Sequence, residues 1–397
     1  MQLSLSKRIS QLQASPTVAL NTKAKELAEQ GHKVINFSVG EPDFATPVPI
    51  VEAAIAALQQ GKTKYGAAGG GLALRQAICQ KLRDDNQLSY EAHQIVVGIG
   101  AKEILFHLAL GLLNEGDEVL IPAPYWVSYT EHVIAAGGKP VIIPLPLDHA
   151  APRLTPAMIK PYVSARTKAI LITSPNNPAG YVIPEDQLRV LGEYLADKPW
   201  WVITDEIYEY MSYDFPAVSL ATLCPALKDR LILVNGFSKG YAMTGWRVGY
   251  MAGPAAVAEI VRTLQTQSST CLPPFIELGA LAALNLGAAR MKEVMTVYKE
   301  RRDLAVCLLR AMPDIDMLAP QGAFYVFIDV RKVLAKSVLY ANNNSLAFSA
   351  KLLNTHYVAM VPGEAFGTPG FLRLSYAVAE EQLREGLRRL GAALQEL

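Results

Sequence analysis

Lys239 lies in the stretch from Val234 to Gly249, shortly after an apolar run. The run Leu231–Val234 has the uninterrupted apolar character of a buried strand, and a glycine-rich break puts Ser238 and Lys239 at its end. Apolar surroundings disfavour the charged form of an amine, so they lower its pKa and favour a nucleophilic lysine. A solvated surface lysine is the alternative, because a Ser-Lys pair by itself is a common pattern.

Arg247 follows Lys239 by eight residues and adds a second kind of chemistry. Its guanidinium is a permanent cation with a planar set of donors that suits a phosphate. The glycines between the two residues allow the backbone to approach a ligand closely. An amine that can form an imine, beside a phosphate clamp, is the combination that pyridoxal phosphate requires.

A second anion site is predicted at Gly98–Lys102, which follows an apolar run and opens a helix predicted over Glu103–Leu113. The amides of Ala101 and Lys102, next to Gly100, would face a phosphate at the helix N-terminus. A tight turn is the simpler interpretation of two glycines at such a junction.

Asp205 ends another apolar run and could pair with the cofactor ring. A carboxylate there can keep a pyridinium nitrogen protonated and make the ring an electron sink. Aspartate is also a common helix N-cap, which is the alternative role. Tyr208 and Asn177 could each donate to the ring oxygen, although Asn177 also fits a plain turn. Trp126 could stack on the ring, although filling a core is the usual role of tryptophan.

Arg373 lies in the strand-like segment Phe371–Ser375 and has no acidic neighbour in the sequence. Burying a guanidinium without an anion is costly, so the carboxylate of a substrate would be a natural counter-ion. A solvent-facing position on an edge strand is the alternative.

The elements that must position these residues alternate between apolar runs and helical patterns from residue 94 to 254. Several runs are nearly continuous, as in strands buried on both faces, so we expect an α/β fold with a mostly parallel seven-stranded sheet sandwiched by helices. The predicted strands are Ile95–Val97, Glu118–Ile121, Val141–Ile143, Ala169–Thr173, Trp201–Thr204, Leu231–Val234 and Val248–Ala252. Ligands of such sheets bind beyond the carboxyl ends of the strands, which would bring Asn177, Asp205 and Lys239 to one edge.

The C-terminal part has a different pattern. Helical segments over 276–311 precede predicted strands at Phe324–Val330, near Val358–Val361 and at Phe371–Ser375, with a helix at 345–354 and an amphipathic helix at the end. This pattern predicts a smaller α+β domain. We expect residues 46–310 to form the large domain, and residues 1–45 with 311–397 to form the small domain and an N-terminal arm, in which Val34–Val39 is a candidate strand.

The composition restricts the possible partners. Among 397 residues, 37 basic and 36 acidic side chains nearly cancel, which argues against nucleic acid or an anionic membrane as the main partner. The four cysteines are scattered, so neither a disulfide framework nor a metal site is expected. Residues 1–13 contain no long apolar segment, so we expect neither a signal peptide nor a membrane span, and a cytoplasmic location.

Taken together and in this order, the motifs resemble those of class I aminotransferases, which are fold-type I pyridoxal-phosphate enzymes. Within that family the chain is most similar to the bacterial and plastid-type aspartate aminotransferases, some of which also accept prephenate. The matching segments are Ser15–Ala19, Gly40–Phe44, Lys64-Tyr65, Asn177–Gly180, Asp205–Tyr208, Ser238-Lys239, Gly245–Gly249 and Phe371–Ser375.

The resemblance implies a role for each site residue. Lys239 would carry the cofactor as a Schiff base and move the proton during catalysis, with Asp205 on the ring nitrogen and Tyr208 on the ring hydroxyl. The implied cofactor contacts are Gly100, Ala101, Lys102, Trp126, Asn177, Asp205, Tyr208, Ser238, Lys239 and Arg247, with Tyr65 of the partner subunit. The implied substrate contacts are Gly40, Trp126, Asn177 and Arg373, with Lys102 and Thr17 at the distal carboxylate.

The implied activity is a ping-pong transamination between aspartate and 2-oxoglutarate, with prephenate or glutamate as further substrates, in a homodimer. An aminotransferase for aromatic or neutral amino acids, or a lyase on the same scaffold, is the alternative enzyme, and a non-catalytic sensor is disfavoured. Two departures from the family pattern stand out. Gly236 replaces a phosphate-binding serine of other branches, and no arginine matches the distal-carboxylate arginine of the best-known branch.

Overall fold

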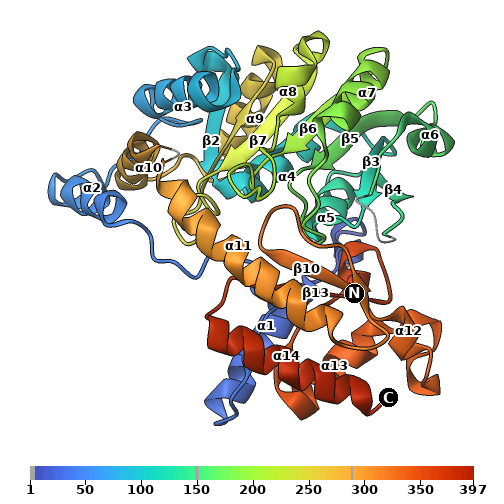
Figure 1. Cartoon of the computed structure of the whole chain (residues 1–397). Helices are drawn as coiled ribbons and strands as arrows, with labels where there is room; N and C mark the ends of the chain where they lie inside the picture. Colours follow the sequence, from blue (N-terminus) through green and yellow to red (C-terminus); the bar gives the residue numbers. More distant parts are fainter. Residues whose placement is uncertain (1–4, 148–151, 288) are drawn as a thin grey trace, which may run out of the picture.

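The computed structural model describes residues 5–147, 152–287 and 289–397. Its centre is a seven-stranded sheet with the strand order β2-β8-β7-β6-β5-β3-β4 (Figure 1). Neighbours from β4 to β7 run parallel, whereas β8 is antiparallel to both β2 and β7. The strands are β2 (Ile95–Ile99), β3 (Glu118–Ala123), β4 (Lys139–Pro144), β5 (Thr167–Thr173), β6 (Trp201–Asp205), β7 (Leu231–Gly236) and β8 (Val248–Ala252). The predicted sheet is therefore confirmed, and each predicted strand matches one of these seven.

Both faces of this sheet are apolar, because alternate residues of one strand enter different cores. Leu231 and Leu233 of β7 pack into one hydrophobic cluster, and Ile232 and Val234 pack into another. The first face is covered by α2 (Val48–Gln59), α3 (Leu72–Asn86), α7 (Glu185–Ala196) and α10 (Pro274–Leu286). The second is covered by α4 (Gly100–Leu112), α5 (Ser128–Ala135) and α9 (Ala255–Gln267). Short helices α6 (Pro156–Ile159) and α8 (Leu220–Leu223) lie in the connections.

A second, smaller sheet has the order β12-β13-β10-β9 and is antiparallel throughout. Its strands are β9 (Asp316–Met317), β10 (Tyr325–Asp329), β12 (Val361–Pro362) and β13 (Phe371–Ser375). Its own hydrophobic core includes residues of α11 (Ala289–Arg310), α13 (Ser345–His356) and α14 (Glu380–Gln395), while α12 (Arg331–Leu334) follows β10 (Figure 1). The smaller α+β unit expected from the C-terminal pattern is present. The proposed boundaries at residues 45/46 and 310/311 stay a prediction.

The N-terminal segment joins this smaller unit. Helix α1 (Pro16–Glu29) packs through Ala24 and Leu27 on residues of α13 and β11. The strand expected over Val34–Val39 is only β1 (Ile35–Asn36), which pairs with β11 (Val358–Ala359). The Phe37 N–H still donates to the Ala359 carbonyl at 2.9 Å, and the next N–H, that of Ser38, donates to the Asn36 side chain at 3.0 Å. The predicted helical stretch 276–311 comprises α10 and α11, and residue 288 lies outside the described residues.

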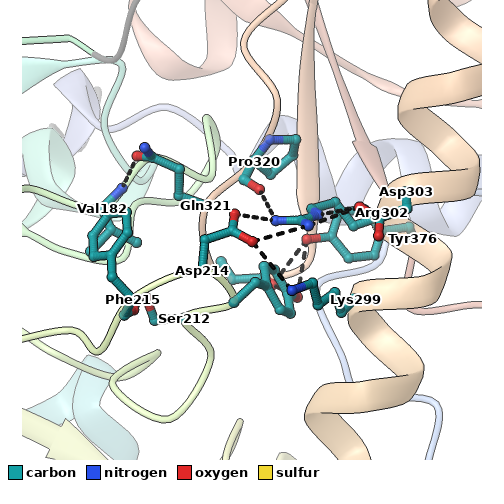
Figure 2. A network of polar contacts seen from close by, with 12 residues as sticks. Val182, Ser212, Asp214, Phe215, Lys299, Arg302, Asp303, Pro320, Gln321 and Tyr376 are labelled. Atoms are coloured by element: carbon teal, nitrogen blue, oxygen red, sulfur yellow. Dashed lines mark hydrogen bonds and ion pairs between the residues drawn. The ribbon is translucent and has the colours of Figure 1, made fainter.

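A polar network links α11 to the loop that follows β6 and to the segment before β10 (Figure 2). The carboxylate of Asp214 accepts hydrogen bonds of 2.6 and 3.4 Å from the Arg302 guanidinium of α11. Arg302 also donates to the Pro320 carbonyl at 3.1 Å, and Lys299 lies 3.4 Å from Asp214. The segment that leads into β10 is thereby held against the loop that follows β6.

Within the described ranges, no helix combines the length and apolar composition that a membrane span needs. The same part of the chain contains no group of three or more His, Cys, Asp or Glu side chains placed to hold a metal ion.

Candidate active site

A cavity of about 560 Å³ opens where the carboxyl ends of β5, β6 and β7 face the smaller sheet. Most residues singled out from the sequence line it: Thr17, Gly40, Ala101, Lys102, Trp126, Asn177, Asp205, Tyr208, Ser238, Lys239, Arg247 and Arg373. Gly100 lies directly behind the Arg247 side chain. Tyr65 does not line the cavity and is 87% exposed. Twelve of the fourteen expected residues thus line the cavity, Gly100 lies next to it and Tyr65 lies outside it, whereas the role of each stays a prediction.

Lys239 lies in the loop that follows β7, and its Nζ donates a 2.5 Å hydrogen bond to the Gly40 carbonyl. The pKa of Lys239 is lowered to about 8, chiefly by burial; the charges of Arg373 and Arg247 also lower it, whereas those of Glu41 and Asp205 oppose the shift. The amine is therefore partly neutral near pH 8, as a nucleophile or a base requires. This excludes the alternative of a solvated surface lysine.

Gly236, at the end of β7, explains one departure from the family pattern. A Cβ at this position would lie 2.9 Å from the Val248 carbonyl oxygen and 3.0 Å from Cα of Gly249. A serine could not be accommodated here without a shift of the neighbouring backbone of β8. The missing phosphate-binding serine is thus linked to the close approach of β7 and β8.

Asp205 ends β6 and is buried. Its Oδ2 accepts a 2.8 Å hydrogen bond from the Tyr129 hydroxyl, and its Oδ1 accepts the Ile207 backbone N–H at 3.2 Å. Burial raises the pKa of Asp205 to about 6, although both hydrogen bonds and the charge of Lys239 counteract that rise. The Ile207 contact resembles the capping alternative, but it leaves one oxygen directed to Tyr129 and the cavity side.

Arg373 projects from β13, and only 2% of its surface is exposed. Its guanidinium donates to Asn177 Oδ1 at 2.9 Å and to the Ser38 carbonyl at 2.6 Å. Its buried Nε has no hydrogen-bond partner within the described part of the chain. Burial lowers the pKa of Arg373, which reflects the cost of a desolvated cation. A carboxylate entering the cavity would supply the missing anion, so the edge-strand alternative does not hold.

The opposite end of the cavity is the N-terminus of α4. Gly100 has a φ of +80°, which favours glycine, and a Cβ there would lie 2.5 Å from an Nη of Arg247. Gly249 is equally restricted, because a Cβ on it would lie 2.1 Å from the Ala101 nitrogen. The Arg247 guanidinium therefore sits against the positive end of a 13-residue helix. An anion between them would relieve their repulsion, and free backbone amides would bind it.

Lys102 and Trp126 form a side wall. The Lys102 ammonium lies 5.0 Å from the Trp126 ring centre, a cation–π contact. Burial lowers the pKa of Lys102, and the nearby charge of Arg247 lowers it further. Trp126 also meets Tyr129 edge to face, with ring centres 5.4 Å apart. This wall therefore offers one cation and one aromatic face to the cavity.

The lining residues that the sequence did not single out include two tyrosines, Tyr129 and Tyr325. Tyr129 comes from α5 and Tyr325 from β10, where the Tyr325 hydroxyl lies 2.8 Å from that of Tyr208. Each was hidden in an apolar pattern that indicates core packing. The only available signal was a hydroxyl on an aromatic residue expected to be buried, because such a group requires a polar partner.

Comparison with known proteins agrees with this geometry. Residues 32–390 match the family Aminotransferase class I and II, and the chain belongs to that family. It is therefore an aminotransferase. It is 44% identical, over the full length of both chains, to a probable aspartate/prephenate aminotransferase of Aquifex aeolicus. It is 38% identical to an aspartate/prephenate aminotransferase of Nitrosomonas europaea, covering 99% of this chain and 100% of the relative.

Solved structures extend the similarity to the whole fold. An aspartate aminotransferase from Thermus thermophilus, with maleate, has a TM-score of 0.92 at 37% identity and covers 99% of this chain and 100% of its own. The aspartate aminotransferase from Rhizobium meliloti has a TM-score of 0.93 at 38% identity, with 99% of each chain covered.

Proposed function

We propose that this aminotransferase uses pyridoxal phosphate to exchange amino groups between aspartate and 2-oxoglutarate, with prephenate and glutamate as further substrates. The observation that carries the proposal is Lys239, an amine with a pKa near 8, placed in one cavity with a buried carboxylate and a buried arginine that lacks an anion. The names of the relatives support the choice of aspartate and prephenate.

The residues present fit the cofactor. Arg247 and the amides of Ala101 and Lys102 would hold its phosphate, and Asp205 would hold its ring nitrogen. Tyr208 and Asn177 would hold the ring oxygen, while Trp126 and Ser238 complete the pocket. When bound, pyridoxal phosphate supplies an aldehyde that condenses with amines and a ring that withdraws electrons from the substrate α-carbon.

The chain's own residues then position the substrate and move protons. Arg373 would bind the α-carboxylate through its unpaired Nε–H, next to the Gly40 backbone. Lys239 would accept the substrate α-proton at Nζ and later donate it again from the same atom, because a pKa of about 8 leaves roughly half of the amine unprotonated near pH 8. Lys102 and Thr17 would contact the distal carboxylate, since both line the same cavity.

A homodimer is part of the proposal. Tyr65 is 87% exposed and outside the cavity, so it is available to a second copy. Large apolar side chains are also exposed on α2 and at the start of α3, namely Val48, Ile55, Leu58 and Leu72. A second copy that covers these side chains would remove their apolar surface from water. Tyr65 of the partner subunit would then complete the phosphate site. The cytoplasmic location stays a prediction.

The test is a panel of amino donors and oxo-acid acceptors with the purified protein and pyridoxal phosphate. Aspartate with 2-oxoglutarate should have the highest kcat/KM, above glutamate with oxaloacetate, alanine and phenylalanine, and prephenate should accept amino groups. A preference for phenylalanine or alanine would support the aromatic or neutral alternative, and keto-acid release without amino transfer would support a lyase. Lys239→Ala should bind the cofactor without covalent attachment and lose turnover; wild-type-like turnover would refute the assignment of Lys239.

A further inference from the structure

Tyr325 occupies a junction between three parts of the cavity. It is fully buried in β10, and its hydroxyl lies 2.8 Å from the Tyr208 hydroxyl. The guanidinium carbon of Arg373 lies 4.5 Å from the centre of its ring. A Cβ on Gly40 would lie 2.7 Å from the Tyr325 oxygen, so this hydroxyl also lies against the segment that accepts from Lys239. The proposed function assigns Tyr325 no role.

We propose that Tyr325 is a positioning residue that couples the carboxylate-binding Arg373 to the hydroxyl of Tyr208. Occupation of Arg373 by a substrate carboxylate would thereby change how strongly Tyr208 donates to the cofactor ring oxygen. The inference rests on the proposed function, since it requires both the cofactor and the carboxylate.

The direction of the hydrogen bond follows from the number of protons. A tyrosine hydroxyl has one proton to donate and can accept through its lone pairs. If the Tyr208 proton points to the ring oxygen, only Tyr325 can donate in the 2.8 Å contact between the two hydroxyls. Tyr325 then polarises the O–H of Tyr208, because consecutive hydrogen bonds strengthen one another.

The charge of Arg373 makes this donation dependent on the ligand. Burial raises the pKa of Tyr325, and the Arg373 cation opposes that rise, so the cation makes Tyr325 a better donor. A carboxylate bound to Arg373 cancels much of that effect. The other charged groups that act on the tyrosine pair are Glu41, Asp205 and Lys239, and Lys239 Nζ lies 6.0 Å from the Tyr208 ring centre.

The backbone around the pair is fixed. Immediately before β10, the Ala323 N–H donates to the Met211 carbonyl at 2.8 Å, and the Tyr213 N–H donates to the Gln321 carbonyl at 2.8 Å. The Arg302–Asp214 network in Figure 2 holds the same two segments together. The Tyr208 ring also meets those of Phe324 and Tyr325 at interplanar angles of 80°. The two hydroxyls are therefore positioned by contacts on both sides.

Tyr325→Phe tests the coupling, because it keeps the ring beneath Arg373 and removes only the donor. The readout is the pH titration of the visible absorbance of bound pyridoxal phosphate, with and without saturating succinate as the carboxylate probe. Donors on the ring oxygen lower the apparent pKa of the nitrogen that joins Lys239 to the cofactor. The variant should therefore titrate about 0.5 to 1 pH unit higher without succinate. The upward shift that succinate causes should also be smaller than in the wild type.

Three controls make the result specific. Tyr376→Phe removes the hydroxyl of another buried tyrosine, which lies 3.1 Å from the Tyr213 hydroxyl, and should titrate like the wild type. Tyr208→Phe alone should reduce the succinate effect as much as Tyr325→Phe does. In the Tyr208→Phe background, Tyr325→Phe should not shift the apparent pKa of the absorbance titration any further. A shift as large as in the wild-type background would overturn the coupling.

The two proposals fail in different ways. If no visible absorbance develops with pyridoxal phosphate, the proposed function is wrong. If the cofactor binds and Tyr325→Phe titrates like the wild type both with and without succinate, the role of Tyr325 is wrong and the proposed function is unaffected.

Discussion

The Tyr129 hydroxyl donates a 2.8 Å hydrogen bond to Oδ2 of Asp205, across 76 residues of sequence and from α5 to the end of β6. Both side chains are buried, and burial raises the pKa of Asp205 to about 6 while raising that of Tyr129 well above its usual range. Tyr129 therefore remains a proton donor throughout the physiological range. Its bond favours the charged form of Asp205, which is the form that would pair with a pyridinium nitrogen.

Tyr129→Phe should shift the pH dependence of cofactor binding to higher pH. Without the donor, the pKa of Asp205 rises further, by about one unit for a lost hydrogen bond to a charged group. The ionised carboxylate is lost as pH falls through that pKa, so affinity for pyridoxal phosphate should weaken at a higher pH than in the wild type. Titration of the apoenzyme between pH 5 and 8, followed by absorbance, measures the difference.

Tyr181→Phe is the matched control for this prediction. Tyr181 is also buried, and it donates no hydrogen bond to Asp205. Tyr181→Phe should therefore leave the pH dependence of cofactor affinity as it is in the wild type. If both variants behaved alike, the effect would come from lost packing rather than from the donor on Asp205.

Glu206 follows Asp205 and should make the apoenzyme less stable at high pH. Its buried carboxylate accepts a 2.8 Å hydrogen bond from Ser219, and burial raises its pKa to about 7. Between the ordinary glutamate pKa and about 7, the folded state holds a proton that the unfolded state has lost, so the free energy of unfolding falls as pH rises.

Glu206→Gln should therefore flatten this dependence and raise the free energy of unfolding of the apoenzyme at pH 8 by about 1–3 kcal/mol. Urea denaturation at pH 5 and pH 8, at one protein concentration, provides the measurement. The exposed Glu115→Gln variant should keep the wild-type dependence. An unchanged slope in Glu206→Gln would contradict the assignment of that dependence to Glu206.

The large sheet and much of the cavity were predictable because both depend on local patterns. Continuous apolar runs mark strands buried on two faces, and the polar residue after each run marks the strand end. Asp205 ends β6 and Lys239 follows the neighbouring strand β7, so the topology alone brings them to one edge. Arg373 was identified by a different signal, a cation inside an apolar strand without an acidic neighbour.

The remaining contacts depend on tertiary structure that no local pattern encodes. The Tyr208–Tyr325 contact joins residues 117 apart, and both rings lie in segments typical of a core. The close approach at Gly236 depends on the antiparallel pairing of β7 and β8, whereas most of the sheet is parallel. Strand ends could therefore be located from the sequence, but the partners that orient their side chains could not.

Lys102→Met should separate dicarboxylic substrates from neutral ones. The change keeps a long apolar stem against Trp126 and removes the charge. Loss of a charged hydrogen bond to the distal carboxylate should reduce kcat/KM for aspartate by about 10- to 100-fold, with little change for alanine or phenylalanine. Steady-state kinetics with aspartate, alanine and phenylalanine as amino donors measures this difference. An equal loss for all three would mean that Lys102 serves only the phosphate site.

The Arg302–Asp214 ion pair should contribute to stability more than an ordinary surface pair does. The Arg302 side chain is 9% exposed, whereas that of Asp214 is 45% exposed, so solvent screens Asp214 far more than Arg302. Asp214→Asn should lower the free energy of unfolding by about 1–2 kcal/mol, because it removes a charged partner of a nearly buried cation. The hydrogen bond from Arg302 holds the pKa of Asp214 below its usual range, so this stabilisation should disappear as pH falls below that lowered pKa.

Asp303→Asn is the matched control, since Asp303 pairs with the same arginine at 2.8 Å but lies on α11 itself. Denaturation of both variants should show a clear loss only for Asp214→Asn; equal losses would mean that the contact between α11 and the loop after β6 stabilises the fold no more than the pair within α11 does.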